Sequence, residues 1–348
     1  MKISMAIEYA RDPLAQVHKV PELERAGVDM VWVAEAYGLD AVSVMGYLAS
    51  ITERVEIASG ILPVYTRTPS LLAQTAVGLD TISEGRFILG LGASGPQVIE
   101  GWHGMEYKKP IQTTREVIEI CRKIWRREEP VTHDGSVFTL PVQPEEGTGL
   151  GKPLKIINHP KRHDIPILLA SLGPKNVEMT AELANEWLPV FFVPERAMDV
   201  WGDDIARGKE KRDPALGEMG IVAGGAVAFG SEAEVGHYRD MGRPMAALYI
   251  GGMGAKGRNF YNDLVRRYGW EEEAELIQDL YLDGRKEEAM AAIPDELLAA
   301  TSLIGDPGYV RERVAAYAEA GVTTLNVTPV GPDPLAVIDQ LRTICDDI

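Results

Sequence analysis

The chain has 348 residues, of which 45% are hydrophobic and 25% charged, as in ordinary globular proteins. Aspartate and glutamate number 52 against 35 lysines and arginines, so the net charge is −17. Such an acidic surface repels phosphate backbones and anionic lipid, which argues against nucleic acid or membranes as partners. Only Cys121 and Cys345 carry thiols, so a disulfide framework is excluded and a cytoplasmic location is expected.

Neither a leader nor a membrane span is predicted. The first residues are too polar for a signal peptide, and no apolar run approaches the ~18 residues of a transmembrane helix.

Strand-like and helix-like segments alternate along the chain. The hydrophobic patterns predict strands at 2–7, 30–34, 55–61, 87–91, 167–170, 188–192, 222–229 and 324–328. Helices are predicted at 14–25, 40–53, 70–82, 113–127, 175–183, 195–211 and 309–319.

A recurring unit indicates the architecture. A helix ends, a glycine such as Gly27 or Gly321 takes the left-handed cap conformation, and a buried strand follows. Buried strands joined by helices form parallel sheets, and eight such units favour a closed (β/α)8 TIM barrel, an α/β fold. The segments 130–166, after strand four, and 238–300, after strand seven, break the rhythm. We expect both to be insertions on a single domain spanning residues 1–348.

In such a barrel, the site forms where strands end and loops begin. The predicted rim is rich in glycine and poor in charge, which suits a flat cofactor whose phosphate rests on backbone N–H groups. Its cofactor-binding candidates, besides Glu8, are Glu35, Gly60, Ile61, Gly92, Ala93, Ser94, Gly95, Ser171, Leu172, Gly173, Pro174, Lys175 and Asn176.

Two rim segments are candidates for phosphate binding. At Gly173–Asn176 a strand gives way to a helix that begins with proline, so free N–H groups and Lys175 could hold an anion; the alternative is an ordinary turn. Gly90–Gly95 matches G-x-G-x-x-G, the dinucleotide fingerprint. Its first glycine falls on the strand, and Gly101 and Gly104 interrupt the next helix, so a Rossmann site is disfavoured.

The remaining candidates are weaker. His159 and His163 have metal-ligand spacing, but Pro160 and two cations lie between them, and no metal is expected. Cys121 shares a helical face with apolar residues and is interpreted as a core thiol. Trp102 and His103 follow the strand-four loop and either line a substrate pocket or simply pack. Apolar residues near the rim, Trp102, Phe191 and Phe192, suggest a hydrophobic substrate pocket.

Several of these segments resemble the luciferase-like monooxygenase superfamily over most of the chain. The similarity lies in Tyr65-Thr66-Arg67-Thr68-Pro69, in Ser83-Glu84-Gly85-Arg86 before strand four with Gly90-Leu91-Gly92 at its end, and in Ala170 to Asn176 with the helix that follows. The segment Ser94 to Gly104 resembles the branch that uses the deazaflavin coenzyme F420.

This resemblance implies a (β/α)8 barrel, commonly a homodimer, with the deazaflavin across the carboxyl-terminal rim. It places the coenzyme's phosphate on the Gly173–Asn176 turn and a non-proline cis peptide at Gly60-Ile61, where the bulge backs the ring system. It also implies a small organic molecule as substrate.

The chain departs from the family pattern at three places. Thr68 replaces a usual histidine, and Glu35-Ala36 replaces a common Asp-His pair, which keeps a carboxylate for cofactor contact but removes a catalytic histidine. The loop Ser94-Gly95-Pro96 lacks the glutamate of some relatives. By position, His103 and Tyr65 are then the candidate catalytic groups for proton transfer.

Three functions remain open. The first is an F420-dependent oxidoreductase that moves a hydride to or from an organic substrate. The second is an FMN-dependent monooxygenase of the same superfamily, and the third is a non-catalytic barrel that binds flavin or deazaflavin.

Overall fold

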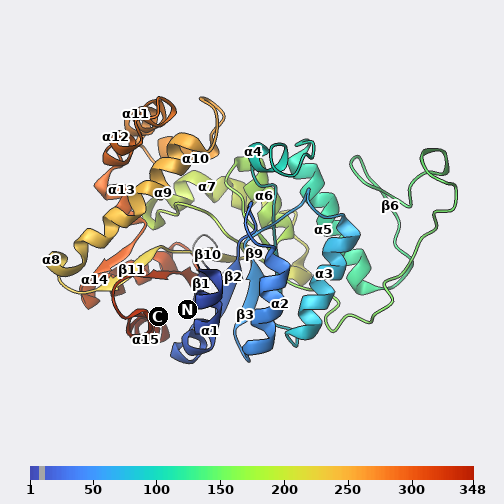
Figure 1. Cartoon of the computed structure of the whole chain (residues 1–348), viewed down its shortest axis with the longest axis horizontal. Helices are drawn as coiled ribbons and strands as arrows, with labels where there is room; N and C mark the ends of the chain where they lie inside the picture. Colours follow the sequence, from blue (N-terminus) through green and yellow to red (C-terminus); the bar gives the residue numbers. More distant parts are fainter. Residues whose placement is uncertain (8–11) are drawn as a thin grey trace.

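A closed parallel barrel forms the centre of the molecule. The computed structural model describes residues 1–7 and 12–348, so Glu8 lies outside the described residues. Eight strands pair in a ring and β13 pairs with β1, which confirms the predicted fold class (Figure 1). In ring order these strands are β1 (Lys2–Ile7), β2 (Met30–Val33), β3 (Glu56–Ser59), β5 (Phe87–Gly92), β8 (Ile167–Leu169), β9 (Glu186–Trp187), β10 (Gly220–Ala223) and β13 (Thr324–Asn326).

Helices cover the outside of the barrel. They are α1 (Pro13–Ala26), α2 (Ala41–Ile51), α3 (Pro69–Ile82), α5 (Pro110–Arg126), α6 (Pro174–Leu183), α7 (Pro194–Lys209), α14 (Pro307–Glu319) and α15 (Pro334–Asp346). Most begin with proline in the first turn, and Asp40, Thr68 and Asp306 cap free N–H groups with their side chains. The sequence patterns did not predict α15, which packs beside α1 and brings the two termini together. The Met1 amino group donates to the Cys345 carbonyl at 2.9 Å.

The core has two layers, because alternate residues of each strand face opposite sides. One apolar cluster lies inside the barrel and comprises Met30, Ala58, Ile88, Leu168, Leu188 and Val222. A larger cluster fills the space between the strands and the helices, and its biggest buried side chains include Trp125, Trp187, Trp201 and Tyr317.

Three predicted strands are wrong in extent. The one expected at 324–328 is divided between β13 and β14 (Thr328–Pro329), which belong to different sheets. The strand expected at 188–192 lies at β9, and Phe191 beyond it has φ 51°, a left-handed conformation that strands do not use. The strand expected at 222–229 is two strands, β10 and β11 (Ala226–Phe229), separated by Gly224 and Gly225. A Cβ at Gly225 would stand 1.9 Å from the Thr301 carbonyl oxygen, so the backbones cross closely there.

The remaining short elements extend the barrel mouth. β11 pairs with β12 (Leu303–Gly305) and β14 (Thr328–Pro329) in a second small parallel sheet. β4 (Leu62–Pro63) continues beyond β3 and pairs with the end of β5, and the single turn α4 (Pro96–Ile99) follows β5.

The two predicted insertions lie at opposite ends of the long axis (Figure 1). The first carries the hairpin β6 (His133–Asp134) and β7 (Thr139–Leu140), then the turn η1 (Pro144–Glu146), and we call residues 130–166 the arm. Between β10 and β13 the chain adds α8 (Glu232–Val235), η3 (Gly236–Gly242), α9 (Arg243–Ala247), η4 (Leu248–Gly252), α10 (Phe260–Arg267), α11 (Glu271–Leu282), α12 (Lys286–Ala291) and α13 (Asp295–Ala300). Within the described residues, no helix is both long and apolar enough to cross a membrane.

Candidate functional site at the barrel mouth

The end of β3 forms a backbone bulge over the barrel interior. The Gly60-Ile61 peptide is cis, as the family resemblance implies. A Cβ at Gly60 would stand 2.3 Å from Cε3 of Trp32, so the bulge rests on that indole. The Trp32 Nε1–H donates to Asn326 Oδ1 at 3.0 Å, which holds the ring in place inside the barrel. Gly60 and Ile61 are partly exposed and present a backbone ridge at the mouth.

The glycines that end β5 lie directly beside this bulge. The Ser59 hydroxyl bonds to both the carbonyl and the N–H of Gly90 at 2.8 Å, and a Cβ at Gly92 would be 3.1 Å from Ile61 Cγ1. Ala93, Ser94 and Gly95 follow, all partly exposed. Ser94 has φ 58°, and its carbonyl accepts a hydrogen bond from the Tyr107 hydroxyl at 3.3 Å.

Hydrogen bonds from buried side chains hold the turn after β8. The buried Ser171 hydroxyl bonds to Thr180 Oγ1 at 2.7 Å, and the indole N–H groups of Trp187 and Trp201 donate to the carbonyls of Ser171 and Leu172 at 2.9 Å. Ser171 and Leu172 therefore support the turn, and the Ser171 hydroxyl is already bonded within the protein.

Beyond these two residues the turn opens at the start of α6. Gly173 caps the helix without any side-chain hydrogen bond, Pro174 and Lys175 are exposed, and Asn176 is partly exposed. The ring of Phe260, at the start of α10, lies 3.7 Å from the position of a Gly173 Cβ. The second insertion thus reaches over the helix N-terminus that the sequence marked as a phosphate site.

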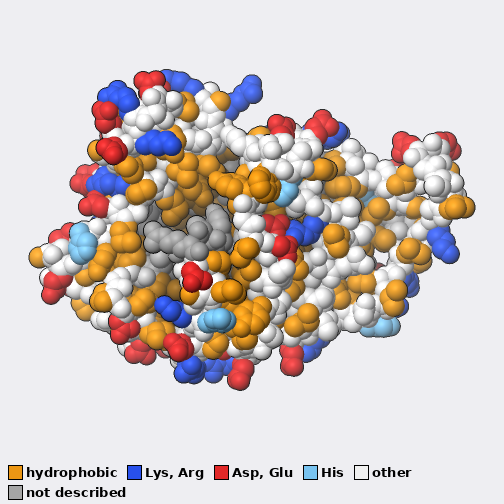
Figure 2. All heavy atoms as spheres, viewed as in Figure 1, with side chains coloured by type: hydrophobic (Ala, Val, Ile, Leu, Met, Phe, Trp, Pro, Cys, Tyr) orange, Lys and Arg blue, Asp and Glu red, His pale blue; other side chains and the backbone are white. Residues whose placement is uncertain are grey.

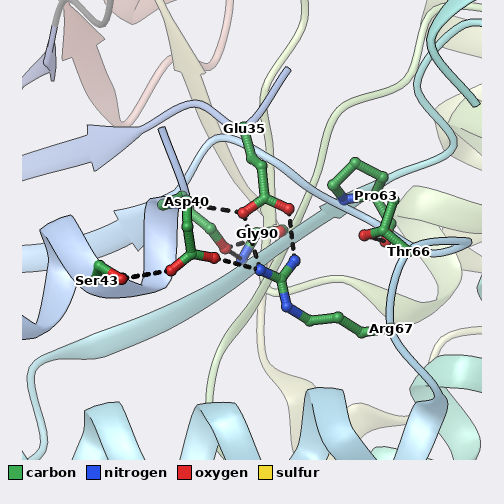
Figure 3. A network of polar contacts seen from close by, with 9 residues as sticks. Glu35, Asp40, Ser43, Pro63, Thr66, Arg67 and Gly90 are labelled. Atoms are coloured by element: carbon green, nitrogen blue, oxygen red, sulfur yellow. Dashed lines mark hydrogen bonds and ion pairs between the residues drawn. The ribbon is translucent and has the colours of Figure 1, made fainter. Parts of the chain in front are cut away.

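Glu35 lies at the rim after β2, but its carboxylate is already paired (Figure 3). Arg67 holds it in a bidentate ion pair at 2.5 and 2.9 Å and also contacts Asp40 at 2.8 Å. The Ala41 N–H donates to the same carboxylate at 3.1 Å. Hydrogen bonding to Glu35 raises the pKa of Arg67, so the guanidinium stays charged. Sequence reasoning missed this use of Arg67, although the residue lies in the Tyr65–Pro69 motif.

The two proposed proton-transfer residues are not joined to each other. The Tyr65 hydroxyl donates to the Lys108 carbonyl at 2.8 Å, and its ring contacts Tyr107 with 5.2 Å between centroids. Burial raises the pKa of Tyr65 to about 12, so at neutral pH it acts as a hydrogen-bond donor and not as a base. His103 has a buried Nε2 without a hydrogen-bond partner in the described structure.

The two aromatic residues predicted for the substrate pocket differ in how far they are exposed to solvent. Trp102 is 66% exposed and leans on the Tyr37 ring, 6.3 Å between centroids. Phe192 is only 2% exposed and stacks against Trp201 and Tyr317, so its placement in the pocket is wrong. The left-handed turn at Phe191 is the reason, because it directs Phe192 into the core and leaves Phe191 facing the second insertion.

The other candidates show no sign of reactivity. No group of three potential metal ligands occurs among the described residues, and His159 and His163 are both exposed. Cys121 is buried in the core, where burial raises the pKa of its thiol, as its interpretation as a core residue requires.

Comparisons with known proteins agree on one family. The chain is 41% identical over 339 residues to the "Putative coenzyme F420-dependent oxidoreductase Rv3520c" of Mycobacterium tuberculosis, which covers 94% of this chain and 95% of the relative. Among solved structures, the coenzyme F420-dependent tetrahydromethanopterin reductase of Methanopyrus kandleri has a TM-score of 0.77 at 22% identity, covering 98% and 97% of the two chains.

A second solved structure has the same fold. It is an F420-dependent secondary alcohol dehydrogenase in complex with an F420-acetone adduct, with a TM-score of 0.73 at 18% identity and coverage of 99% and 98%. The model of the family described as luciferase-like monooxygenase matches residues 4–324 of this chain. With most of its length matched, the protein belongs to the luciferase-like monooxygenase family.

Proposed function

We propose that this protein is a coenzyme F420-dependent oxidoreductase that moves a hydride between the deazaflavin and a small organic substrate. The observation that carries the proposal is a continuous strip at the barrel mouth. Because β3, β5 and β8 are neighbours in the ring, the bulge at Gly60-Ile61, the loop Gly92–Gly95 and the turn Gly173–Asn176 adjoin one another. The 41% identity to the mycobacterial relative supports the choice of coenzyme.

The residues of the strip fit an extended, anionic, ring-bearing molecule. At one end, the uncapped start of α6 offers backbone N–H groups, the positive end of the helix dipole and the exposed ammonium of Lys175, all suited to a phosphate. At the other end, the ridge of Gly60 and Ile61 over Trp32 presents an uncharged, shaped support for a planar ring.

The bound deazaflavin would supply a two-electron hydride carrier, and the protein's own groups position the reactants. Arg67 holds the Glu35 side chain in a bidentate ion pair, which fixes its position at the rim. The Tyr65 phenol stays protonated and can donate a hydrogen bond. His103, with its buried and unpartnered Nε2, is the candidate to hold or release a proton.

A fluorescence titration of the purified protein with coenzyme F420, run in parallel with FMN, tests the proposal. We expect tight binding of the deazaflavin and little affinity for FMN. Lys175→Ala should weaken deazaflavin binding by about 10-fold through lost phosphate contact, while Lys152→Ala, an exposed lysine of the arm, should leave it unchanged. Preferential FMN binding would overturn the proposal and favour an oxygen-consuming monooxygenase.

A turnover assay distinguishes an enzyme from a barrel that only binds the coenzyme. Reduced coenzyme F420 should be oxidised on addition of a suitable organic substrate, and His103→Asn should lower that rate more than it lowers coenzyme affinity. Tight binding without turnover across a broad substrate panel would identify a non-catalytic binding barrel instead.

A further inference from the structure

Five aromatic side chains gather at one side of the barrel mouth, although they come from distant parts of the chain. Tyr65 and Tyr107 follow β4 and β5, Phe191 follows β9, and Tyr249 and Tyr261 belong to the second insertion. Ring centroids are 5.2 Å apart for Tyr65 and Tyr107, 4.7 Å for Tyr249 and Tyr261, and 6.1 and 6.5 Å from Phe191 to Tyr249 and Tyr261. We call these five residues the aromatic wall.

The wall adjoins the proposed cofactor strip. The Tyr107 hydroxyl donates to the Ser94 carbonyl at 3.3 Å, and Phe260, next to Tyr261 in sequence, covers the Gly173 turn. The Tyr107 phenol also lies near enough to Tyr261 to add to the rise in its pKa. Hydrophobic side chains gather on this face between α10 and α4 (Figure 2).

The wall borders the core but is not enclosed by it. All five side chains are partly exposed, whereas the neighbouring Phe192 and Tyr317 are buried. Apolar ring surface left open beside a catalytic rim costs free energy in water unless a ligand covers it.

The wall is also electrically neutral. Burial raises the pKa of Tyr65, Tyr107 and Tyr261, so these phenols remain uncharged donors. Two cations close to it in sequence are compensated, because Arg67 pairs with Glu35 and Asp40, and Lys108 pairs with Glu106 at 2.7 Å. The Lys109 ammonium donates to the Ser136 carbonyl at 3.2 Å. The five rings themselves offer no cation to offset the desolvation of a phosphorylated or carboxylated substrate.

We propose that the aromatic wall is the substrate subsite and that it takes a neutral, flat, apolar molecule, an aromatic or conjugated carbonyl compound. The inference rests on the proposed function and narrows its substrate class. The ring faces stack on the apolar body of the ligand, and the Tyr261 O–H can donate to a carbonyl oxygen.

A matched pair of probes tests the charge preference. 2-Acetylnaphthalene and 2-naphthoate share a ring system and differ in charge, and each is titrated by calorimetry into the protein with and without coenzyme F420. We expect the neutral ketone to bind at least about 10-fold more tightly than the carboxylate. Equal affinity, or a preference for the carboxylate, would overturn the proposal.

Substitutions in the aromatic wall test whether the ketone binds there. Tyr249→Ala and Tyr261→Ala should each weaken binding of the ketone about 3- to 10-fold, whereas Tyr249→Phe and Tyr261→Phe keep the rings and most of the affinity. Tyr47→Ala removes an exposed tyrosine of α2 that pairs with His18 of α1 and is not part of the wall, so it should change nothing. Unchanged affinity in both wall-directed alanine variants contradicts the assignment.

Coenzyme affinity, measured on every variant, distinguishes failure of the proposed F420-dependent function from failure of the substrate subsite. Normal coenzyme binding without selectivity between the probes overturns the subsite alone. Failure of the unmodified protein to bind the coenzyme overturns the proposed function, and the titration without coenzyme still decides whether the wall selects the neutral ketone. Normal coenzyme binding by the alanine variants also shows that they are folded.

Discussion

At the scale of single residues, the rim of the site holds a nearly buried ion pair between Glu35 and Arg67. The two side chains are only 9% and 14% exposed, so each ion depends on the other for the solvation it has lost. The pair accordingly fixes the geometry of the β2 loop, and it removes Glu35 from the set of free bases.

Breaking this pair should be costly. Arg67→Met leaves a buried carboxylate without its partner, and we expect the free energy of unfolding in urea to fall by about 3 kcal/mol. The double variant Glu35→Gln/Arg67→Met should regain part of this loss. Arg311→Met, which breaks an exposed pair with Asp347, should cost below about 1 kcal/mol. Equal losses for Arg67→Met and Arg311→Met would show that burial of the Glu35 pair is unimportant.

Glycine at position 90 is required by contact between strands. A Cβ there would stand 1.6 Å from the Ser59 carbonyl oxygen, so β3 and β5 would have to separate. We expect Gly90→Ala to lower the free energy of unfolding by about 3 kcal/mol, which should appear as a clear drop in the melting temperature. Gly78→Ala lies within α3 with open space around it and should be neutral or slightly stabilising. Similar melting temperatures for both variants would contradict this account.

At the scale of elements, one carboxylate fastens the arm to the barrel. Glu116 of α5 is buried and accepts hydrogen bonds from the backbone N–H groups of residues 136–138. Burial opposes its ionisation, but hydrogen bonds from Gln112 and from this backbone outweigh burial and lower the pKa of Glu116 to about 2. The ionised form is therefore the one that holds the hairpin.

Neutralising that group should loosen the arm first. Glu116→Gln replaces charge-assisted bonds by weaker ones, and we expect hydrogen exchange of residues 133–140 to rise at least about 10-fold, with a loss of about 2 kcal/mol in global stability. The matched control is Glu119→Gln, a partly exposed position of the same helix. Because the folded-state pKa is depressed, wild-type protein should lose this anchor as the pH falls from about 4.5 towards 2. Unchanged exchange in the arm would refute the anchoring role.

At the scale of the whole molecule, the two ends of the barrel differ in chemistry. The mouth carries glycines and aromatic rings, whereas the opposite end, where strands begin, carries Lys2, Glu56 and Glu186. Lys2 pairs with Glu56 at 2.7 Å, and one buried oxygen of Glu186 has no partner in the part of the chain that the structure describes. Burial, reinforced by the Glu56 carboxylate, raises the pKa of Glu186 to about 7.

This buried acid should make stability depend on pH. The folded state retains the Glu186 proton from pH about 4.5 to about 7, where the unfolded chain has lost it, so the contribution of this group falls as pH rises through that window. We expect wild-type protein to lose about 2 kcal/mol between about pH 5 and 8 from this source, measured by urea unfolding. Glu186→Gln should show a flatter profile, and parallel profiles would disprove the assignment.

Local patterns were enough to predict much of this molecule. Buried strands alternating with capped helices predicted the barrel, because hydrophobic period and chain-reversing glycines are properties of short segments. The Gly-Pro helix start located the exposed turn at Gly173–Asn176. The family resemblance located the ridge at Gly60-Ile61. Local patterns also assigned Cys121 to the core.

The tertiary structure alone decided which side chains face one another. Arg67 and Glu35 are 32 residues apart, and Tyr261 meets Phe191 only because the second insertion folds back over the mouth. Phe191 and Phe192 are neighbours of equal hydrophobicity, and a single left-handed residue sends one to the mouth and the other to the core. Sequence by itself determined most of the elements and the rim, whereas charge pairing and the aromatic wall depend on long-range contacts that leave no local pattern.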